Sequence, residues 1–186
     1  GVNVFGKSGT FANLVITRGS KLMAVGTKSA PIVFSSDDEA LDGSGEWGGL
    51  IIHGYAPHNE CAEGGSYCDI DSEGESGFAG GYDPDDSSGV LRYVVVAEGG
   101  YEFSTGNEIN GISLVGVGSG TEMDYIQVHG NSDDGIEFYG GNVNVKHGVF
   151  TNNNDDSVDW DEGYQGNLQY IIVKQGASKG EAFEMD

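Results

Sequence analysis

Two acidic motifs in the second half of the chain carry the residues best suited to chemistry. Asn131 begins the segment Asn-Ser-Asp-Asp-Gly-Ile-Glu-Phe, and Asn153 begins Asn-Asn-Asp-Asp-Ser-Val-Asp-Trp. Carboxylates gathered in this way coordinate a hard cation, for which Ca²⁺ is the natural candidate, or serve as acid and base in glycoside hydrolysis. The candidate metal ligands in these motifs are Asp133, Asp134, Glu137, Asp155, Asp156, Asp159 and Asp161.

Close carboxylates need some form of electrostatic relief. Two of them about 5 Å apart repel each other by roughly 3 kcal/mol at an effective dielectric constant of about 20. A bound cation, a raised pKa or splaying of the side chains into water would each supply that relief. We therefore interpret the motifs as a Ca²⁺ site or, alternatively, as a solvated acidic face.

A third acidic segment alternates oxygen-bearing side chains in the manner of a calcium loop. Asp69, Asp71 and Glu73 occupy alternate positions, and Gly74 takes the sixth place. The twelfth place falls on Gly80 instead of the bidentate glutamate of an EF-hand. These three acids are candidate Ca²⁺ ligands, with a polar surface loop as the alternative.

The two acidic motifs belong to a longer internal repeat. The second motif starts 22 residues after the first, and the apolar strands that precede them start at Tyr125 and His147. A looser third copy starts at Tyr170, and earlier copies of the two strands start at Tyr93 and Asn110. A fixed period of this length is typical of a solenoid.

The repeat predicts the fold. Each unit consists of short segments rich in valine and isoleucine between Gly, Asn, Asp and Ser clusters, which favours strands and turns over helices. We predict an all-β, right-handed parallel β-helix of about eight coils of roughly 22 residues, with equivalent residues stacked about 4.8 Å apart. Ile136 should then lie on Val158 in the core, whereas Glu137 and Asp159 face outward. Stacked asparagines should bond along the axis.

Composition and charge exclude several classes of protein. With 33 glycines but only 3 prolines in 186 residues, the chain is not collagen-like, and 37% hydrophobic residues are too many for a disordered chain. The net charge of −22 argues against a nucleic-acid partner or an anionic membrane surface. No apolar run could form a transmembrane segment. We expect a single domain over residues 1–186.

The cysteines indicate the compartment. Cys61 and Cys68 lie in a short glycine-rich stretch, which predicts a local disulfide within a loop insertion at about residues 55–88. Because disulfides persist in oxidising compartments, we expect an extracellular or outer-surface protein. Gly1 is not an initiator methionine, so we expect a trimmed product or a fragment of a longer solenoid. End-to-end pairing of open terminal strands is the alternative.

Two segments carry a family resemblance. The pattern Gly-Thr-x-x-x-Pro-Ile-x-Phe starting at Gly26 and the Trp-Gly-Gly strand starting at Trp47 resemble secreted bacterial right-handed parallel β-helix proteins. These are surface or lipoprotein-type products of marine Gram-negative bacteria, and most have no assigned activity. The resemblance implies a β-helix exported by a bacterium and supplies no catalytic residues.

The acidic motifs also resemble those of polygalacturonase-type glycoside hydrolases. In that family the catalytic aspartates lie in Asn-Thr-Asp and Asp-Asp motifs, which implies catalytic roles for Asp133 or Asp134 and for Asp155 and Asp156. The family's Gly-His-Gly and Arg-Ile-Lys elements are missing from this sequence. Substrate carboxylates would therefore lack a basic partner.

Together these features favour a secreted, non-catalytic surface or matrix protein that is stabilised by Ca²⁺ and binds cell-surface or matrix polysaccharide, with no organic cofactor. A glycoside hydrolase or lyase that uses aspartates of adjacent coils is one alternative. A self-assembling extracellular filament subunit is another. Catalysis requires two carboxylates about 5 to 9.5 Å apart in an open groove, so the geometry separates the first two functions.

Overall fold

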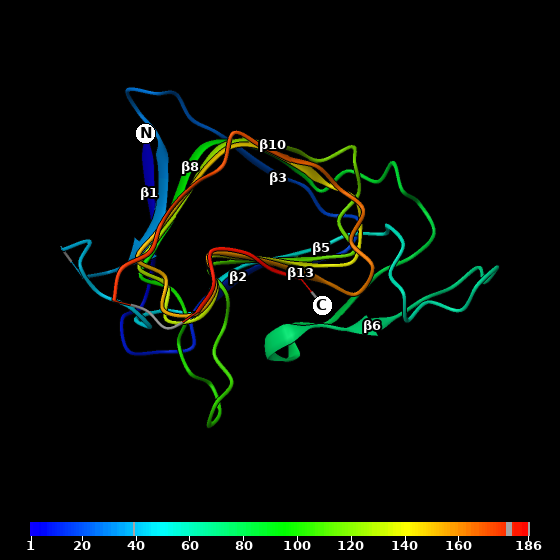
Figure 1. Ribbon diagram of the computed structural model, residues 1–186, viewed down its shortest axis with the longest axis horizontal. Helices are drawn as coiled ribbons and strands as arrows, with labels where there is room; N and C mark the ends of the chain where they lie inside the picture. Colours follow the sequence, from blue (N-terminus) through cyan, green and yellow to red (C-terminus); the bar gives the residue numbers. More distant parts are fainter. Residues whose placement is uncertain (39, 178–179, 186) are drawn as a thin grey trace.

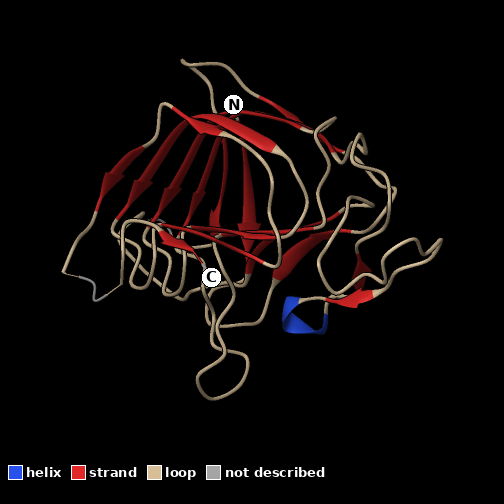
Figure 2. Cartoon of the chain, turned by 45° about the vertical axis from the view of Figure 1, so that its right-hand side comes forward, coloured by secondary structure: helices blue, strands red, loops and turns tan. Residues whose placement is uncertain are grey.

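In the computed structural model, which describes residues 1–38, 40–177 and 180–185, two sheets of parallel strands enclose one core (Figures 1 and 2). The side chain of Glu73 also lies outside the described part. The upper layer in Figure 1 is the eight-stranded sheet, made of β1 (Val2–Gly6), β3 (Leu22–Val25), β4 (Ile32–Ser36), β8 (Gly89–Ala97), β10 (Glu122–His129), β12 (Asn144–Thr151), β14 (Leu168–Gln169) and β15 (Ile172–Lys174). The lower layer is the six-stranded sheet, made of β2 (Asn13–Ile16), β5 (Gly49–His53), β9 (Ile112–Val115), β11 (Ile136–Tyr139), β13 (Val158–Asp161) and β16 (Glu184–Met185).

The predicted stacking of equivalent residues is confirmed in the six-stranded sheet. Ile136 lies opposite Ile112 on one side and Val158 on the other, and all three are buried in the core. Asn131 and Asn153 are fully buried in the turns, and the backbone N–H of Asn131 donates to Oδ1 of Asn153 at 3.2 Å. The 22-residue period therefore matches one turn of the chain around the core.

The predicted count of about eight coils stays a prediction, and the spacing between neighbouring coils varies along the chain. The described strands of the six-stranded sheet number six, and partners are 62 residues apart at Leu50 and Ile112 but 24 apart at Ile112 and Ile136. The difference arises because residues 55–88 and 101–109 form long excursions outside the coils (Figure 1). The fold is all-β with parallel sheets, and its right-handed winding stays a prediction.

The long strands β8, β10 and β12 each bend at one residue with left-handed backbone, and the same conformation recurs between β14 and β15. Tyr93, Tyr125, His147 and Tyr170 have positive φ angles between 51° and 62°. Their rings stack in succession with centroid separations of 4.4, 4.4 and 4.9 Å. Left-handed backbone costs roughly 1–2 kcal/mol at a non-glycine residue, and aromatic contacts recover about 0.5–1.5 kcal/mol each. The stack therefore offsets much of the strain of the bends.

Residues 55–88, called the insertion below, are held together by the predicted disulfide. Cys61 and Cys68 are bonded, and a short hairpin of β6 (Ile70–Asp71) and β7 (Phe78–Ala79) flanks the 3₁₀ turn η1 (Glu73–Glu75). The Arg18 guanidinium joins the insertion to the coils by donating to the carbonyl oxygens of Cys68 at 2.6 Å and Gly80 at 2.8 Å. In the described part of the chain, no helix is long and apolar enough to cross a membrane.

The disulfide should stabilise the insertion and not the coils. Replacing Cys61 and Cys68 by serine removes a short loop closure worth about 2–3 kcal/mol in the chain-entropy model. We expect faster amide hydrogen exchange in residues 61–68 and unchanged exchange in β11 and β13. Equal acceleration in β11 would show that the bond supports the whole solenoid.

Candidate functional site

The acidic motifs converge on the outer face of the six-stranded sheet and on the turns that lead into it. Within β11, Ile136 and Phe138 point into the core, so the intervening Glu137 points outward, as expected from the alternation of a strand. Glu137 lies opposite Ser113 and Asp159 on the neighbouring strands. The sheet therefore brings acids of successive coils side by side.

In the turns, a second row of Asn and Asp side chains accepts hydrogen bonds from the backbone of the next coil. Asn110 Oδ1 accepts the backbone N–H of Asp134 at 3.2 Å, and Asp134 Oδ1 accepts that of Asp156 at 2.9 Å. Asp156 in turn accepts the backbone N–H of Glu181. Each side-chain oxygen accepts a backbone N–H group in the turn before the next strand, which is the physical reason for Asp or Asn at these positions.

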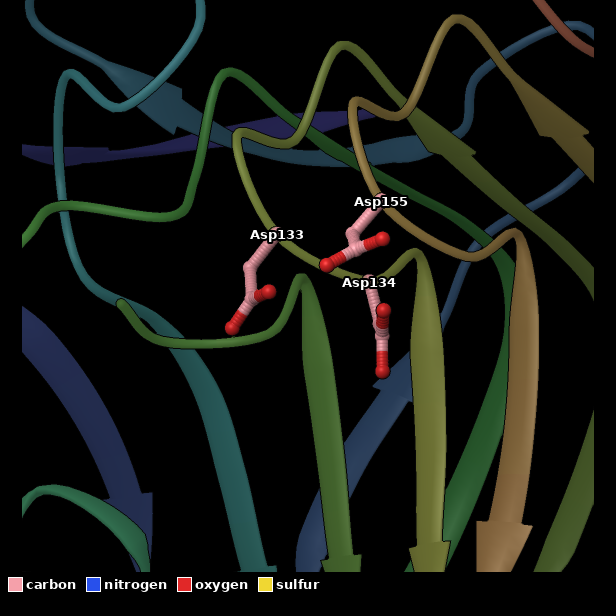
Figure 3. Close-up of side chains that lie close together, drawn as sticks. All are labelled: Asp133, Asp134 and Asp155. Atoms are coloured by element: carbon pink, nitrogen blue, oxygen red, sulfur yellow. The ribbon is translucent and has the colours of Figure 1, made fainter. Parts of the chain in front are cut away.

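These two rows bring carboxylates close enough to share a cation. In three groups, one oxygen from each residue lies within 4.8 Å of the others. Figure 3 shows the first group, in which Asp133 and Asp134 come from one coil and Asp155 from the next. The groups are Asp133, Asp134 and Asp155; Asp134, Glu137 and Asp159; and Asp156, Glu181 and Glu184.

The second group is buried, although a solvated face was the alternative expectation. Asp134, Glu137 and Asp159 are only 8, 9 and 8% exposed. The Asn110 amide donates to Glu137 and, at 3.1 Å, to the hydroxyl of Tyr139, so polar side chains pack over the carboxylates. The interpretation as a fully solvated face is wrong for these three residues.

Burial and mutual repulsion raise two pKa values in the turns. Burial, followed by the negative charge of Asp133, raises the pKa of Asp134 to about 8. Burial, followed by the charges of Glu108 and Asp155, raises the pKa of Asp133 to about 6. Both causes penalise the ionised carboxylate, so a cation at this position would be stabilised by the same groups that repel one another.

The cation-free protein should lose stability as the pH rises. Because the folded state holds protons on Asp133 and Asp134 up to about pH 6 and 8, it binds more protons than the unfolded chain above pH 3.8. The free energy of unfolding should therefore fall by several kcal/mol between pH 4 and pH 9. Urea unfolding in EDTA checks this, and Asp134→Asn should flatten the slope. A profile that rises over this range would contradict the assignment.

A groove separates the insertion from the outer face of the sheet. It has a volume of about 400 Å³, and Tyr139 on its wall links it through Asn110 to Glu137. His53, 1% exposed, bonds through Nε2 to Ser72 Oγ at 2.7 Å and ties the insertion to β5. Burial lowers the pKa of His53 to about 4, so the imidazole is neutral at pH 7. The residues lining the groove are His58, Glu60, Ile70, Asp71, Ser72, Val115, Tyr139 and Glu162.

In the predicted calcium loop of the insertion, the described part of the structure shows Asp69 and Asp71 in different surroundings. Asp69 is paired with Arg18 at 2.5 Å and accepts the hydroxyl of Tyr67, so its carboxylate is used within the insertion. Asp71 is exposed in β6, and none of the three described carboxylate groups includes Asp69 or Asp71. The side chain of Glu73 lies outside the described residues. Asp69 is therefore engaged by Arg18, and shared ligation of Ca²⁺ by Asp69, Asp71 and Glu73 stays a prediction.

One predicted ligand lies outside the three carboxylate groups, and two acids that were not predicted lie within them. Asp161 falls opposite Tyr139 in the register and belongs to none of the three groups. Glu181 and Glu184, which the sequence interpretation missed, join Asp156 in the third group. Glu184 lies opposite Asp159, so extending the repeat register by one coil would have found it.

Comparison with known proteins supports the architecture. A family model described as a pectate-lyase-like β-helix domain matches residues 1–186. No curated protein and no solved structure matches the chain. The parallel sheets, the stacked turns and this match over the full length agree, and the chain therefore belongs to the pectate-lyase-like β-helix domain family.

Proposed function

We propose that the protein is a secreted, non-catalytic β-helix protein of the bacterial surface or matrix, which binds polysaccharide and is stabilised by Ca²⁺. The observation that carries the calcium site is the buried group of Asp134, Glu137 and Asp159, whose oxygens lie within 4.8 Å of one another. The polysaccharide partner is supported by the pectate-lyase-like family and by the groove beside Tyr139.

The donor set fits a hard divalent cation. Ca²⁺ takes oxygen ligands, and carboxylates on three neighbouring positions of rigid strands and turns supply them without the nitrogen or sulfur donors that transition metals favour. Asp134, Glu137 and Asp159 would hold the ion. When bound, it would supply the positive charge that offsets repulsion between adjacent coils.

The close spacing and the burial of Asp134, Glu137 and Asp159 disfavour glycosidase catalysis by these three residues. Paired carboxyls of glycosidases stand about 5–5.5 Å apart in retaining enzymes and about 6.5–9.5 Å apart in inverting ones, and both need access to a sugar ring. Oxygens within 4.8 Å of one another and side chains 8–9% exposed leave little room for a sugar or a catalytic water. A structural cation site accounts for both features.

Calorimetric titration tests this function directly. Adding CaCl₂ to protein stripped with EDTA should give saturable heat at sub-millimolar Ca²⁺, and the Ca²⁺-loaded protein should bind a soluble polysaccharide in affinity gel electrophoresis. Absence of Ca²⁺ binding at millimolar concentration would overturn the cation site. Intact Ca²⁺ binding without retention by any polysaccharide would overturn the binding role alone.

One observation favours a second candidate, a polysaccharide-degrading enzyme. Asp133 is half-buried with a pKa raised by burial to about 6, and it lies beside the exposed Asp155 on the next coil. A carboxylic acid whose pKa is raised toward neutrality, beside a second carboxyl group, suits general acid–base catalysis. Release of reducing ends or of unsaturated sugars, lost in Asp133→Asn, would establish this activity.

End-to-end self-association is a third candidate, favoured by apolar residues on the outermost strands. Phe5 of β1 is 56% exposed, and Met185 of β16 is 61% exposed. Parallel strand edges pair readily with other chains. Sedimentation velocity should show concentration-dependent polymers if the ends dock, and a single 19.5 kDa species if they do not.

A further inference from the structure

Three exposed tyrosines surround one cavity at the insertion, away from the acidic groups. The cavity has a volume of about 380 Å³, and Tyr55, Tyr67 and Tyr82 line it. Their exposed fractions are 41, 74 and 36%, so all three rings are open to solvent. Neither the coil packing nor the acidic site uses these rings.

The rings are held in place instead of moving freely. The Tyr82 hydroxyl donates to the carbonyl oxygen of Ala62 at 2.7 Å, and the Tyr67 hydroxyl donates to Asp69. The Arg18 guanidinium lies 5.1 Å from the centre of the Tyr55 ring. The disulfide stiffens the same segment, since Cys68 also lines the cavity. Pre-ordered aromatic side chains bind ligands at little entropic cost.

The charges around the cavity indicate an uncharged ligand. Arg18 is the one basic residue among its described lining residues, and it already donates to Cys68, Gly80 and Asp69. Asp83 lines the cavity as well, and the whole chain carries a net charge of −22. An anionic sugar such as a uronate would meet repulsion here, because the guanidinium of Arg18 is already paired with Asp69.

Tyrosine-lined walls with polar ends suit a sugar ring. The C–H faces of a neutral sugar are apolar and pack against aromatic rings, whereas its hydroxyls can bond to tyrosine hydroxyls, carboxylates and backbone carbonyls. The cavity is within the size range of about 300–1,000 Å³ that is usual for small-ligand sites.

We propose that Tyr55, Tyr67 and Tyr82 form a binding subsite for a neutral polysaccharide. This inference rests on the proposed polysaccharide-binding function and names both its ligand class and its location. The polysaccharide would then bind at the insertion, whereas the acidic groups of the coils would bind Ca²⁺.

Affinity gel electrophoresis with a defined panel tests the subsite. The neutral probes are laminarin, galactomannan and xyloglucan, and the acidic probes are polygalacturonate and alginate, all in Ca²⁺-containing buffer. At least one neutral probe should retard the protein, whereas neither acidic probe should. Tyr67→Ala and Tyr82→Ala should each weaken the retardation about tenfold or more, equivalent to about 1.4 kcal/mol.

Tyr170→Ala is the matched control, because Tyr170 is 63% exposed but lies between β14 and β15 and does not line the cavity. It should bind like the unmodified protein. The melting temperature and a Ca²⁺ titration of each variant show whether it is folded.

Binding of a neutral polysaccharide that survives both cavity substitutions would overturn the subsite and leave the proposed function standing. Binding of the acidic probes alone would overturn the neutral ligand class. No binding by any probe would overturn the inference together with the polysaccharide-binding role.

Discussion

Replacing Phe138 by alanine should lower the free energy of unfolding by about 3–5 kcal/mol. The side chain is fully buried, lies opposite Leu114 and Trp160 on the neighbouring strands, and stacks on Tyr164 with ring centroids 4.4 Å apart. Alanine would leave a cavity that the rigid strands on both sides cannot close. Guanidinium unfolding followed by far-ultraviolet circular dichroism measures the loss.

Phe78→Ala provides the matched control for that substitution. Phe78 is 55% exposed in the hairpin of the insertion, so the same change removes little buried surface. Its unfolding free energy should change by less than about 1 kcal/mol. Similar losses in both variants would contradict a core in which residues of successive coils stack on one another.

Replacing Glu137 by glutamine should change the stability in opposite directions with and without calcium. Glutamine keeps the shape and one oxygen that can accept the Asn110 amide, but it removes the charge. In EDTA at pH 9, where Asp134 with its pKa of about 8 is ionised, the variant should be more stable by about 1–3 kcal/mol because carboxylates within 4.8 Å repel. In millimolar CaCl₂ it should be less stable, since a ligand is lost.

Glu63→Gln is the control for this change, because Glu63 is exposed in the disulfide loop and belongs to none of the described carboxylate groups. Its melting temperature should match that of the unmodified protein in both buffers. A Glu137→Gln variant that is destabilised equally with and without calcium would show that the carboxylate has only a structural role in the fold.

Much of the core could be predicted from the sequence because the register of parallel coils follows directly from the repeat. The 22-residue offset places Ile136 on Val158 and Asn131 on Asn153, and the alternation of a strand places Glu137 outward. Each of these steps needs only the period and the geometry of a strand.

The insertion at residues 55–88 could be predicted as a loop, but its internal contacts could not, since loops carry no period. The fate of Asp69 depends on Arg18, which is distant in sequence and reaches the insertion only in the folded chain. Burial of Glu137 and Asp159 likewise depends on polar groups packed over the sheet, and no local pattern encodes this. Stacked rings at Tyr93 and Tyr125 share a left-handed backbone that spacing alone does not reveal.

The most direct test of the calcium site is an anomalous difference map from crystals grown with CaCl₂ and measured at long wavelength. If Ca²⁺ binds there, a peak should appear about 2.3–2.6 Å from carboxylate oxygens of Asp134, Glu137 and Asp159. A map with no peak among these three residues, from crystals that contain millimolar calcium, would contradict the calcium site.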